Sequence, residues 1–313
     1  MSSDLRHDAV DLGPPRVEEV ADRVFTYVQP DGSWWINNSG FLVADDSVVV
    51  IDTCSTERRT RAFLDAVHGV SDAPLRLLVN THHHGDHTHG NYLTHPAAIV
   101  AHERCRELIL ETGIMHVPGV WDDVDWGDLE VSPPIVTFDD RLTVWSGDTE
   151  VELRYIGTPA HTTNDIVAWL PEQRVLYAGD LVFNGGTPFV MMGSLAGALE
   201  SVERLRSFGA EVIVPGHGEV CGPAALDRVE RYYRFVDDVA AEADRAGVGA
   251  LEAAREADLG EFAELTDAER LAGNLHRALA ERRGAERGAP IDLVSAVGDM
   301  LTYNGGRPMR CLA

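Results

Sequence analysis

The sequence predicts an α/β fold whose strands alternate with helices, followed by a helical C-terminal extension. Over residues 17–222, short runs of Val, Ile and Leu alternate with segments of helical periodicity, an order that builds sheets covered by helices. Beyond Gly222 the strand-like runs stop and only amphipathic helical patterns remain. We therefore expect three regions: an N-terminal arm at residues 1–16, a core at 17–222 and a helical extension at 223–313.

The first half of the core begins with strands and ends in a histidine-rich segment. The runs VADRVFTYVQ, GFLVA and SVVVID predict three strands, with a turn at Asp45-Asp46. A helix is predicted at residues 57–69, followed by a buried strand, LRLLVN, that leads directly into the histidines. Residues 102–112 are again helical, whereas 113–134 form a long loop, and loops of this length in compact domains are commonly functional.

Each predicted strand in the second half leads to a His or an Asp. TEVELRYIG precedes His161, RVLYAG precedes Asp180, and EVIVPG, after a predicted helix at 194–208, precedes His217. Side chains at strand ends in helix-covered sheets gather at one cleft. The extension follows as three amphipathic helices in the segments AALDRVERYYRFVDDVAAEADRAG, LTDAERLAGNLHRALAERRG and PIDLVSAVGDMLTYNGG.

The charge balance limits the partners and the chemistry of the chain. There are 26 basic and 51 acidic residues, a net charge of -25, and every basic side chain is arginine. A strongly acidic chain without a basic stripe argues against nucleic acids and anionic membranes as partners. Without lysine, a Schiff base on a side-chain amine is also excluded.

Cysteine usage and the N-terminal residues indicate a cellular compartment. The four cysteines are scattered without a C-x-x-C pair, which is typical of a reducing environment. Residues 1–16 are polar and lack the apolar stretch of a signal peptide, and no segment is apolar over the length of a membrane span. We therefore expect a cytoplasmic protein.

Seven side chains of the kind that bind metal ions follow the predicted strands. They are His82, His84, Asp86, His87, His161, Asp180 and His217. His82 and His84 alternate, which places both on one side of extended backbone, and Gly85 permits a tight bend that turns the next two ligands toward a second ion. A lone histidine is more often an ordinary core or surface residue, and a histidine-rich tract alone could merely scavenge metal. The three distant ligands favour a two-metal site suited to zinc.

These motifs resemble those of the metallo-β-lactamase-fold superfamily. The resemblance covers roughly residues 17–222 and rests on THHHGDH, TPAH, AGD and PGH. It implies a four-layer αββα sandwich followed by the helical extension. By motif position it also implies two metal sites. The first would be made by His82, His84 and His161, and the second by Asp86, His87 and His217. Asp180 would bridge the two ions. Two Zn²⁺ ions are expected per chain, with Mn²⁺ or Fe²⁺ as alternatives.

Such a site implies catalysis on a carbonyl group. A metal ion lowers the pKa of bound water to about 7, and a second ion can polarise the substrate carbonyl. The metal-bound hydroxide then acts as base or nucleophile, so no serine or cysteine nucleophile is required. Asp86 is a candidate to hydrogen-bond that hydroxide besides binding metal. His116, in the 113–134 loop, is a candidate proton shuttle if the loop closes over the metals.

Asp180 distinguishes branches of the superfamily. The secreted antibiotic-degrading members usually carry Cys or Ser at this position, so β-lactam hydrolysis is not the expected native activity. Glyoxalase II-type hydrolases share the aspartate, but they bind glutathione through basic residues in a helical C-terminal domain, which a lysine-free tail matches poorly. The segments YVQPDGSWWINNSGFLV, AHTTNDIVAWLP and GDLVFNGGTPFVMMGS resemble actinobacterial members that include zinc-dependent second-ring cyclases of aromatic polyketide pathways. These relatives imply ester or thioester hydrolysis, or aldol cyclisation of a polyketide intermediate.

Alternative activities are a glyoxalase II-like thioesterase, a lactonase and a β-lactamase-like hydrolase. A phosphodiesterase should present basic clusters for phosphates, which the net charge of -25 opposes. A single-iron dioxygenase needs fewer ligands, and a non-catalytic metal-binding protein should lack some of them, whereas none of the seven is missing. The expected partner is a small carbonyl substrate, free or carried by coenzyme A or a carrier protein, and a dimer is one option for the oligomeric state.

Several further residues could surround the site. Aromatic and methionine side chains could wall a flat apolar pocket for an aromatic or polyketide chain, or simply pack in the core and loops: Trp34, Trp35, Trp121, Trp126, Met191 and Met192. His83 and His89 are expected to be supporting or surface residues. Asn164 and Thr162 follow His161 and are expected to orient it.

Overall fold

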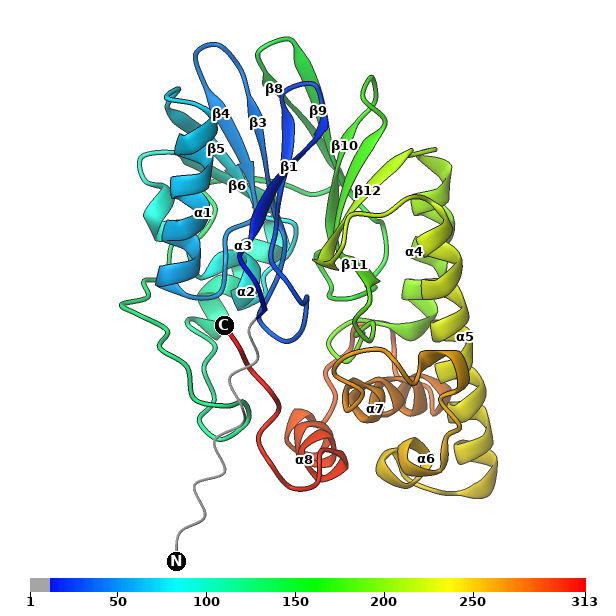
Figure 1. Ribbon diagram of the computed structural model, residues 1–313. Helices are drawn as coiled ribbons and strands as arrows, with labels where there is room; N and C mark the ends of the chain where they lie inside the picture. The colour runs from blue at the N-terminus through cyan, green and yellow to red at the C-terminus, as the bar shows by residue number, and fades with distance from the viewer. Residues whose placement is uncertain (1–11) are drawn as a thin grey trace, which may run out of the picture.

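Two β-sheets lie face to face, with helices on both outer surfaces (Figure 1). The computed structural model describes residues 12–313, so residues 1–11 of the predicted arm lie outside the described residues. The first strand already begins at Arg16. The layers form the predicted αββα sandwich, and a helical C-terminal region follows it.

The strands are divided unequally between the sheets. The first sheet has seven, in chain order: β1 (Arg16–Ala21), β2 (Val24–Val28), β3 (Ser39–Val43), β4 (Val48–Ile51), β5 (Leu75–Val79), β6 (Ala98–His102) and β7 (Val136–Phe138). Pairing is antiparallel from β1 to β4 and parallel from β4 to β7. The second sheet has five, in the order β12 (Val212–Gly218), β11 (Val175–Asn184), β10 (Ile166–Leu170), β9 (Thr149–Tyr155) and β8 (Arg141–Ser146). Only β11 and β12 of this sheet pair in parallel.

Helices cover the outer face of each sheet. The first sheet carries α1 (Glu57–Val70) and α3 (Glu103–Thr112), and the second carries α4 (Leu195–Ser207) and α5 (Ala224–Ala246). The remaining helices and 3-10 turns are α2 (Gly85–Thr88), η1 (Asn91–Thr94), α6 (Ala250–Glu256), η2 (Gly260–Phe262), α7 (Arg270–Arg282) and α8 (Leu293–Tyr303). Between residues 12 and 313, no helix combines the length and the apolar character needed to cross a membrane.

Strand β4 shows how the sequence pattern sets the layers. All four of its residues are buried. Val49 and Ile51 pack against inward-facing side chains of the second sheet, whereas Val48 and Val50 pack with Phe63 of α1. Successive side chains of a strand point to opposite faces. Because both faces of β4 are covered, its sequence is a continuous apolar run rather than an alternating one.

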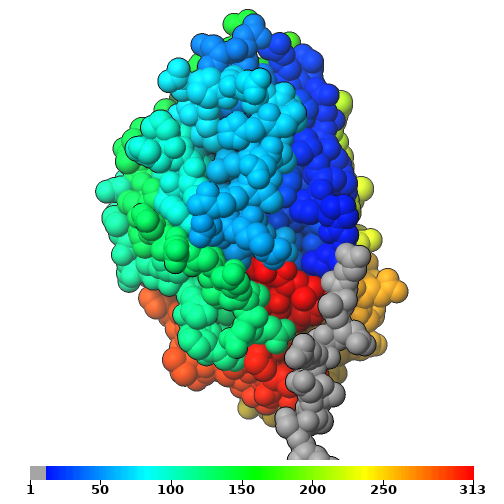
Figure 2. Space-filling view, turned by 60° about the vertical axis from the view of Figure 1, so that its left-hand side comes forward, coloured from blue at the N-terminus to red at the C-terminus, as the bar shows by residue number. Residues whose placement is uncertain are grey.

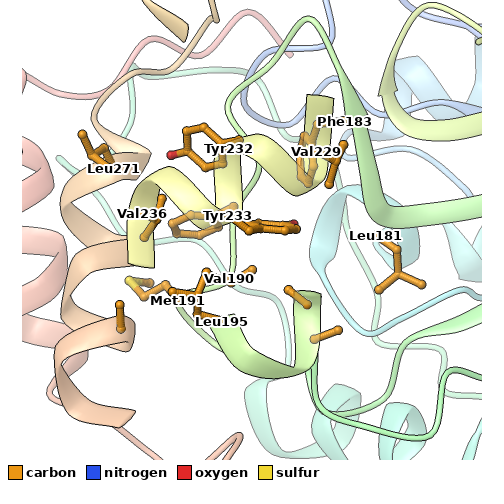
Figure 3. Close-up of a cluster of buried hydrophobic side chains, with 14 of the residues drawn as sticks. Leu181, Phe183, Val190, Met191, Leu195, Val229, Tyr232, Tyr233, Val236 and Leu271 are labelled. Atoms are coloured by element: carbon orange, nitrogen blue, oxygen red, sulfur yellow. The ribbon is translucent and has the colours of Figure 1, made fainter. Parts of the chain in front are cut away.

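The C-terminal helices share a core with the outer face of the second sheet. Tyr233 of α5 and Leu271 of α7 lie in one buried cluster with Val190 and with Leu181 of β11 (Figure 3). The amphipathic faces predicted for these helices are therefore buried against the sandwich itself.

The segment after α8 returns to the long loop at residues 113–134. The backbone N–H of Met309 donates to the carbonyl of Val120 at 2.9 Å, and Asp122 N–H donates to the carbonyl of Met309 at 2.9 Å. Figure 2 shows this red segment between the blue N-terminal half and the green loop. The loop is thus held by the C-terminal region although it contains no helix or regular strand.

The structure differs from the predicted elements in two respects. Strands β6, β7, β8 and β10 and helices α2 and α6 lie in segments for which no element was predicted. The strand predicted to end before Asp180 instead continues through it to Asn184, and His217 likewise lies inside β12. The pairing of β11 with β12 is irregular on both sides of Asp180, between Tyr177 and Phe183. This irregularity allows a ligand to leave the ladder without ending the strand.

Candidate metal centre

Seven side chains from five segments meet at one edge of the two sheets. His82 and His84 follow β5, Asp86 and His87 lie on the single turn α2, and His161 lies in the loop after β9; Asp180 and His217 project from β11 and β12. Their ligand atoms form two groups, each with all atoms within 4.8 Å of one another. The first group is His82, His84, His161 and Asp180, and the second is Asp86, His87, Asp180 and His217. The structure therefore brings together every residue of the predicted ligand set.

Asp180 is common to both groups. Its Oδ1 lies 3.1 Å from Nε2 of His87, and its Oδ2 lies 3.3 Å from Nε2 of His161 and 3.4 Å from Nε2 of His217. Asp86 contributes a second carboxylate, with Oδ2 3.1 Å from Nε2 of His217. A carboxylate between two sets of imidazole nitrogens is arranged to bridge two cations.

The donor atoms fit a pair of metal ions. Nε2 of His82, Nε2 of His87 and Oδ1 of Asp180 are buried without a hydrogen-bond partner. Unpaired buried polar atoms cost free energy and are rare in native proteins, so a cation in contact with them would remove the cost. Imidazole nitrogen with carboxylate oxygen is a ligand set that zinc commonly takes.

The histidines of the site differ in pKa, because burial lowers the pKa of some and the two carboxylates raise that of others. Burial lowers the pKa of His82 and of His84 well below the ordinary value, and neighbouring histidines add to the effect. Burial also opposes charge on His217, but Asp180 and Asp86 outweigh it and raise its pKa to about 9. The adjacent histidines, His217 and His87 among them, hold the pKa of Asp86 and of Asp180 below the usual range despite burial. The site thus keeps two anionic ligands in a buried place, which favours a bound cation.

Acceptor groups orient three of the imidazoles through Nδ1. His161 Nδ1 lies 2.6 Å from the carbonyl of Phe189, His217 Nδ1 lies 3.1 Å from that of Gly32, and His87 Nδ1 lies 2.8 Å from Oδ2 of Asp52. Because these oxygens only accept, each Nδ1 donates and each Nε2 is left for metal. His84 instead offers Nδ1, which lies 2.8 Å from Nε2 of His161.

Asp52 contacts the candidate ligand His87 although the sequence did not point to it. It follows β4, is 2% exposed, and also accepts hydrogen bonds from the backbone N–H and the hydroxyl of Thr81 at 2.7 Å each. The only sequence signal was an acidic residue closing the apolar run SVVVID.

The side chains of Asn164 and Thr162 form hydrogen bonds with residues other than His161, contrary to prediction. Thr162 donates its backbone N–H and its hydroxyl to Asp165 at 2.8 and 2.6 Å, which closes a tight turn. The Asn164 amide lies 3.0 Å from Nδ1 of His83. Thr162 is used within the turn and the Asn164 amide by His83, so the bond that orients His161 comes from the distant carbonyl of Phe189.

His83 and His89 are supporting residues rather than surface ones. Both are buried, 4% and 3% exposed, and burial lowers the pKa of His83 to about 3 and that of His89 to about 4. His89 stacks on Trp35, with ring centroids 5.6 Å apart. The ring of His89 also occupies the space that a side chain on Gly85 would need. Gly85 is not among the residues with positive φ, so the close approach of His89, not a special bend, requires a glycine there.

A cavity of about 560 Å³ opens onto the ligands. Trp34, Trp35, Trp121, Met191 and Met192 line it, in the arrangement predicted for an apolar pocket. Trp126 packs behind them against Trp35, with ring centroids 4.8 Å apart.

His116 lies at the rim of this region. The side chain is exposed and its ring contacts Trp126 at a centroid distance of 5.5 Å, while its neighbours Met115 and Val117 line the cavity. A role of His116 as proton shuttle stays a prediction.

The sequence model described as the metallo-beta-lactamase superfamily matches residues 32–217, more than half of the chain. The chain belongs to the metallo-beta-lactamase superfamily. All seven ligand residues fall inside the matched range. Solved structures agree with the fold: the metallo-beta-lactamase from Pontibacter korlensis superposes with a TM-score of 0.59 at 21% identity, covering 71% of this chain and 99% of that one. The DIM-1 metallo-beta-lactamase gives 0.58 at 20% identity, covering 71% and 98%.

Curated relatives within this superfamily differ in activity. Hydroxyacylglutathione hydrolase from Rhodospirillum rubrum is 33% identical over 138 residues, 44% of this chain and 45% of that protein. Linear primary-alkylsulfatase from a Pseudomonas species is 24% identical over 240 residues, 64% of this chain and 44% of that protein. The chain therefore spans less than half the length of these superfamily relatives.

Proposed function

We propose that the chain is a dinuclear zinc enzyme that hydrolyses an ester or thioester, or cyclises a polyketide intermediate by aldol chemistry. The observation that carries the proposal is Asp180, whose carboxylate belongs to both ligand groups and lines the apolar cavity. Two metal ions held there would polarise a substrate carbonyl and activate a water molecule. Both reactions develop negative charge on an oxygen beside the ligands, so one site serves either.

The protein's own side chains position the reactants. Asp86 lines the cavity while its Oδ2 lies 3.1 Å from Nε2 of His217, so we assign it a second role as hydrogen-bond acceptor for the attacking water. Trp34 and Trp35 line the cavity beside the ligands and present apolar surface to it. The chain has no lysine, so an aldol reaction here cannot proceed through a side-chain Schiff base.

A glyoxalase II-like thioesterase is the second candidate, favoured by the 33% identity with the Rhodospirillum rubrum hydroxyacylglutathione hydrolase. For either activity, the proposed substrate is a small carbonyl compound, free or carried by coenzyme A or a carrier protein. We also propose a cytoplasmic location, which the four unpaired cysteines support.

Metal analysis of the purified protein tests the proposal first. Two zinc ions per chain are expected; one iron per chain would favour a dioxygenase, and a protein without metal would refute the proposal. A panel of acyl thioesters, lactones, phosphodiesters and β-lactams then separates the hydrolytic alternatives.

The bridging role is tested by Asp180→Ala. This variant is expected to lose one of two metal ions and most turnover of a simple acyl thioester, with an unchanged circular dichroism spectrum. Asp46→Ala, in an exposed turn, is the matched control and should keep both ions. Full activity of Asp180→Ala would contradict the bridging role.

A further inference from the structure

The methionines of this chain are concentrated in one place. The sequence has six, and all except Met1, which lies outside the described residues, line the cavity above the metal ligands: Met115, Met191, Met192, Met300 and Met309. They come from the 113–134 loop, from the segment between β11 and α4, from α8 and from the segment after it. A distribution over four segments that converges on one cavity is not explained by the packing of any single element.

These thioethers are interleaved with aromatic rings. Trp34 makes edge contacts with Trp121 and Phe189, at centroid distances of 5.6 and 5.2 Å. The sulfur atoms of Met191 and Met300 and the ring of Phe189 all meet at Gly273, where an added side chain would collide with them. Methionine is polarisable and flexible and makes favourable contacts with aromatic rings, so this lining suits a flat aromatic ligand.

The cavity offers no free positive charge away from the metal ligands. Among the described residues that line it, Arg270 is the one permanent cation, and it is 2% exposed. Its guanidinium pairs with Asp267 at 3.0 Å, donates to the carbonyl of Thr187 at 3.0 Å and lies 4.0 Å from the centroid of Trp34. An anionic group of a substrate that lies away from the metal ligands would therefore be desolvated in the cavity without a partner.

The outer wall lies beyond the part of the chain matched by the superfamily model. Residues of α8, Val297 and Met300 among them, and Met309 after it line the cavity, whereas the match ends at residue 217. Part of the cavity wall thus comes from outside the matched range, whereas the candidate ligands and the tryptophan lining lie inside it.

We infer that this cavity is a recognition site for an uncharged, flat aromatic acyl group and discriminates against acyl groups that carry a negative charge into the cavity, such as a sulfonated aromatic ring. The inference rests on the proposed function for the reaction that the bound group undergoes. It assigns specificity to the methionine and tryptophan lining and to α8, rather than to the metal ligands.

Methyl-labelled methionine gives a direct readout of binding, because all but one of the methyl signals report on the cavity. The zinc-loaded full chain, labelled with ¹³C at the methionine methyl groups, is titrated with 2-acetylnaphthalene, an uncharged ketone that cannot be hydrolysed. Its sulfonated analogue and 2-dodecanone serve as the charged and aliphatic comparisons. Single Met→Leu variants assign the signals.

We expect ring-current shifts at several cavity methyl groups, and binding of the uncharged aromatic ketone at least about tenfold tighter than that of either comparison. Equal or tighter binding of the sulfonate or the aliphatic ketone would overturn the inference.

Gly298 allows the cavity to be filled without disturbing the protein. It lines the cavity within α8, and a Cβ atom added there meets no atom within 4 Å. Gly298→Phe is therefore expected to fold, and to weaken binding of 2-acetylnaphthalene about tenfold or more by occupying its place. Gly69→Phe, on α1 and equally unobstructed, is the matched control and should bind as the wild type does. Unchanged binding by Gly298→Phe would overturn the assignment of α8.

The two proposals fail in different ways. If 2-acetylnaphthalene binds as expected but the chain neither hydrolyses an ester or thioester nor cyclises a polyketide substrate, the proposed reaction is wrong and the recognition site stands. If a small acyl thioester is hydrolysed while the methionine signals do not respond to the aromatic ketone, the reaction stands and the recognition site is refuted.

Discussion

Nδ1 of His87 lies 2.8 Å from Oδ2 of Asp52, a residue 35 positions earlier in the chain. Asp52 sits at the end of β4 with a φ of 57°, and its carboxylate is also held by the backbone and the hydroxyl of Thr81. A carboxylate fixed by these two donors can hold an imidazole with its other nitrogen toward a metal. The strained backbone at Asp52 is therefore maintained by the contacts that orient a ligand.

Replacing Asp52 should weaken metal binding more than it changes the fold. Asn tolerates a positive φ, so Asp52→Asn keeps the backbone but loses the charged acceptor for His87. We expect affinity for the second metal ion to fall by about 10–100-fold, measured by competition with a chelator. Asp148→Asn, at an exposed turn, should bind metal normally. Equal metal affinities in the two variants would show that Asp52 does not support metal binding.

Gly216 should tolerate no side chain. A Cβ there would overlap Oδ1 of Asp180 and the backbone of Gly179. Gly216→Ala is expected to reduce the free energy of unfolding by about 1–3 kcal/mol and to lower metal content, as seen by chemical denaturation and elemental analysis. Gly222→Ala, just beyond β12 and with only ordinary contact to Glu211, should change neither quantity. A fully metallated Gly216→Ala protein would show that Asp180 has room to move.

Removing metal should lower the thermal stability of the protein. Asp86 and Asp180 remain anionic in a buried site, and an ion that binds only the folded state stabilises it by about 2.7 kcal/mol at a hundred times its Kd. We expect the Tm to fall on addition of a chelator and to recover with Zn²⁺. The Asp180→Ala variant should show a smaller response. A Tm that does not change when chelator is added would indicate that the folded protein tolerates the buried carboxylates without bound ions.

Asp267 should make stability depend on pH below neutrality. Burial raises its pKa from 3.8 to about 6, only partly opposed by Arg270. A raised pKa means that the folded state binds the proton more tightly, so this contribution is present below about pH 4 and is lost as the pH rises to about 6. The loss amounts to about 3 kcal/mol. Comparing wild type with Asp267→Asn by denaturation across this range isolates the contribution, and parallel pH profiles would count against it.

The sequence predicted those helices and strands whose pattern of apolar and polar residues is evident within a short segment. Apolar runs such as β4 and β5 and the periodic helices α1, α4 and α5 carry their signal within a few residues. Strand β10, in contrast, directly follows the tight turn at Asp165, and β8 alternates exposed and partly buried residues, so neither stood out. The ligand set could be located because its residue types are distinctive.

The supporting residues could not be predicted in the same way. Nothing near Asp52 distinguishes it from the exposed Asp45 and Asp46, since its role depends on a histidine brought close only by folding. The direction of the His116 ring depends on Trp126 and on the path of a loop without regular structure. Residue type can be read from the sequence, whereas orientation is a property of the assembled layers.

The separation between the metal ligands and the outer cavity wall has a consequence for how such a protein can change. All seven candidate ligands lie between residues 82 and 217, while α8 and Met309 supply part of the cavity wall. Mutation or recombination within the last two dozen or so residues can alter which molecules enter while leaving the chemical machinery untouched. Selection can therefore act on substrate range and on reactivity as two nearly independent traits, a favourable starting point for evolving or engineering new selectivity on an old catalyst.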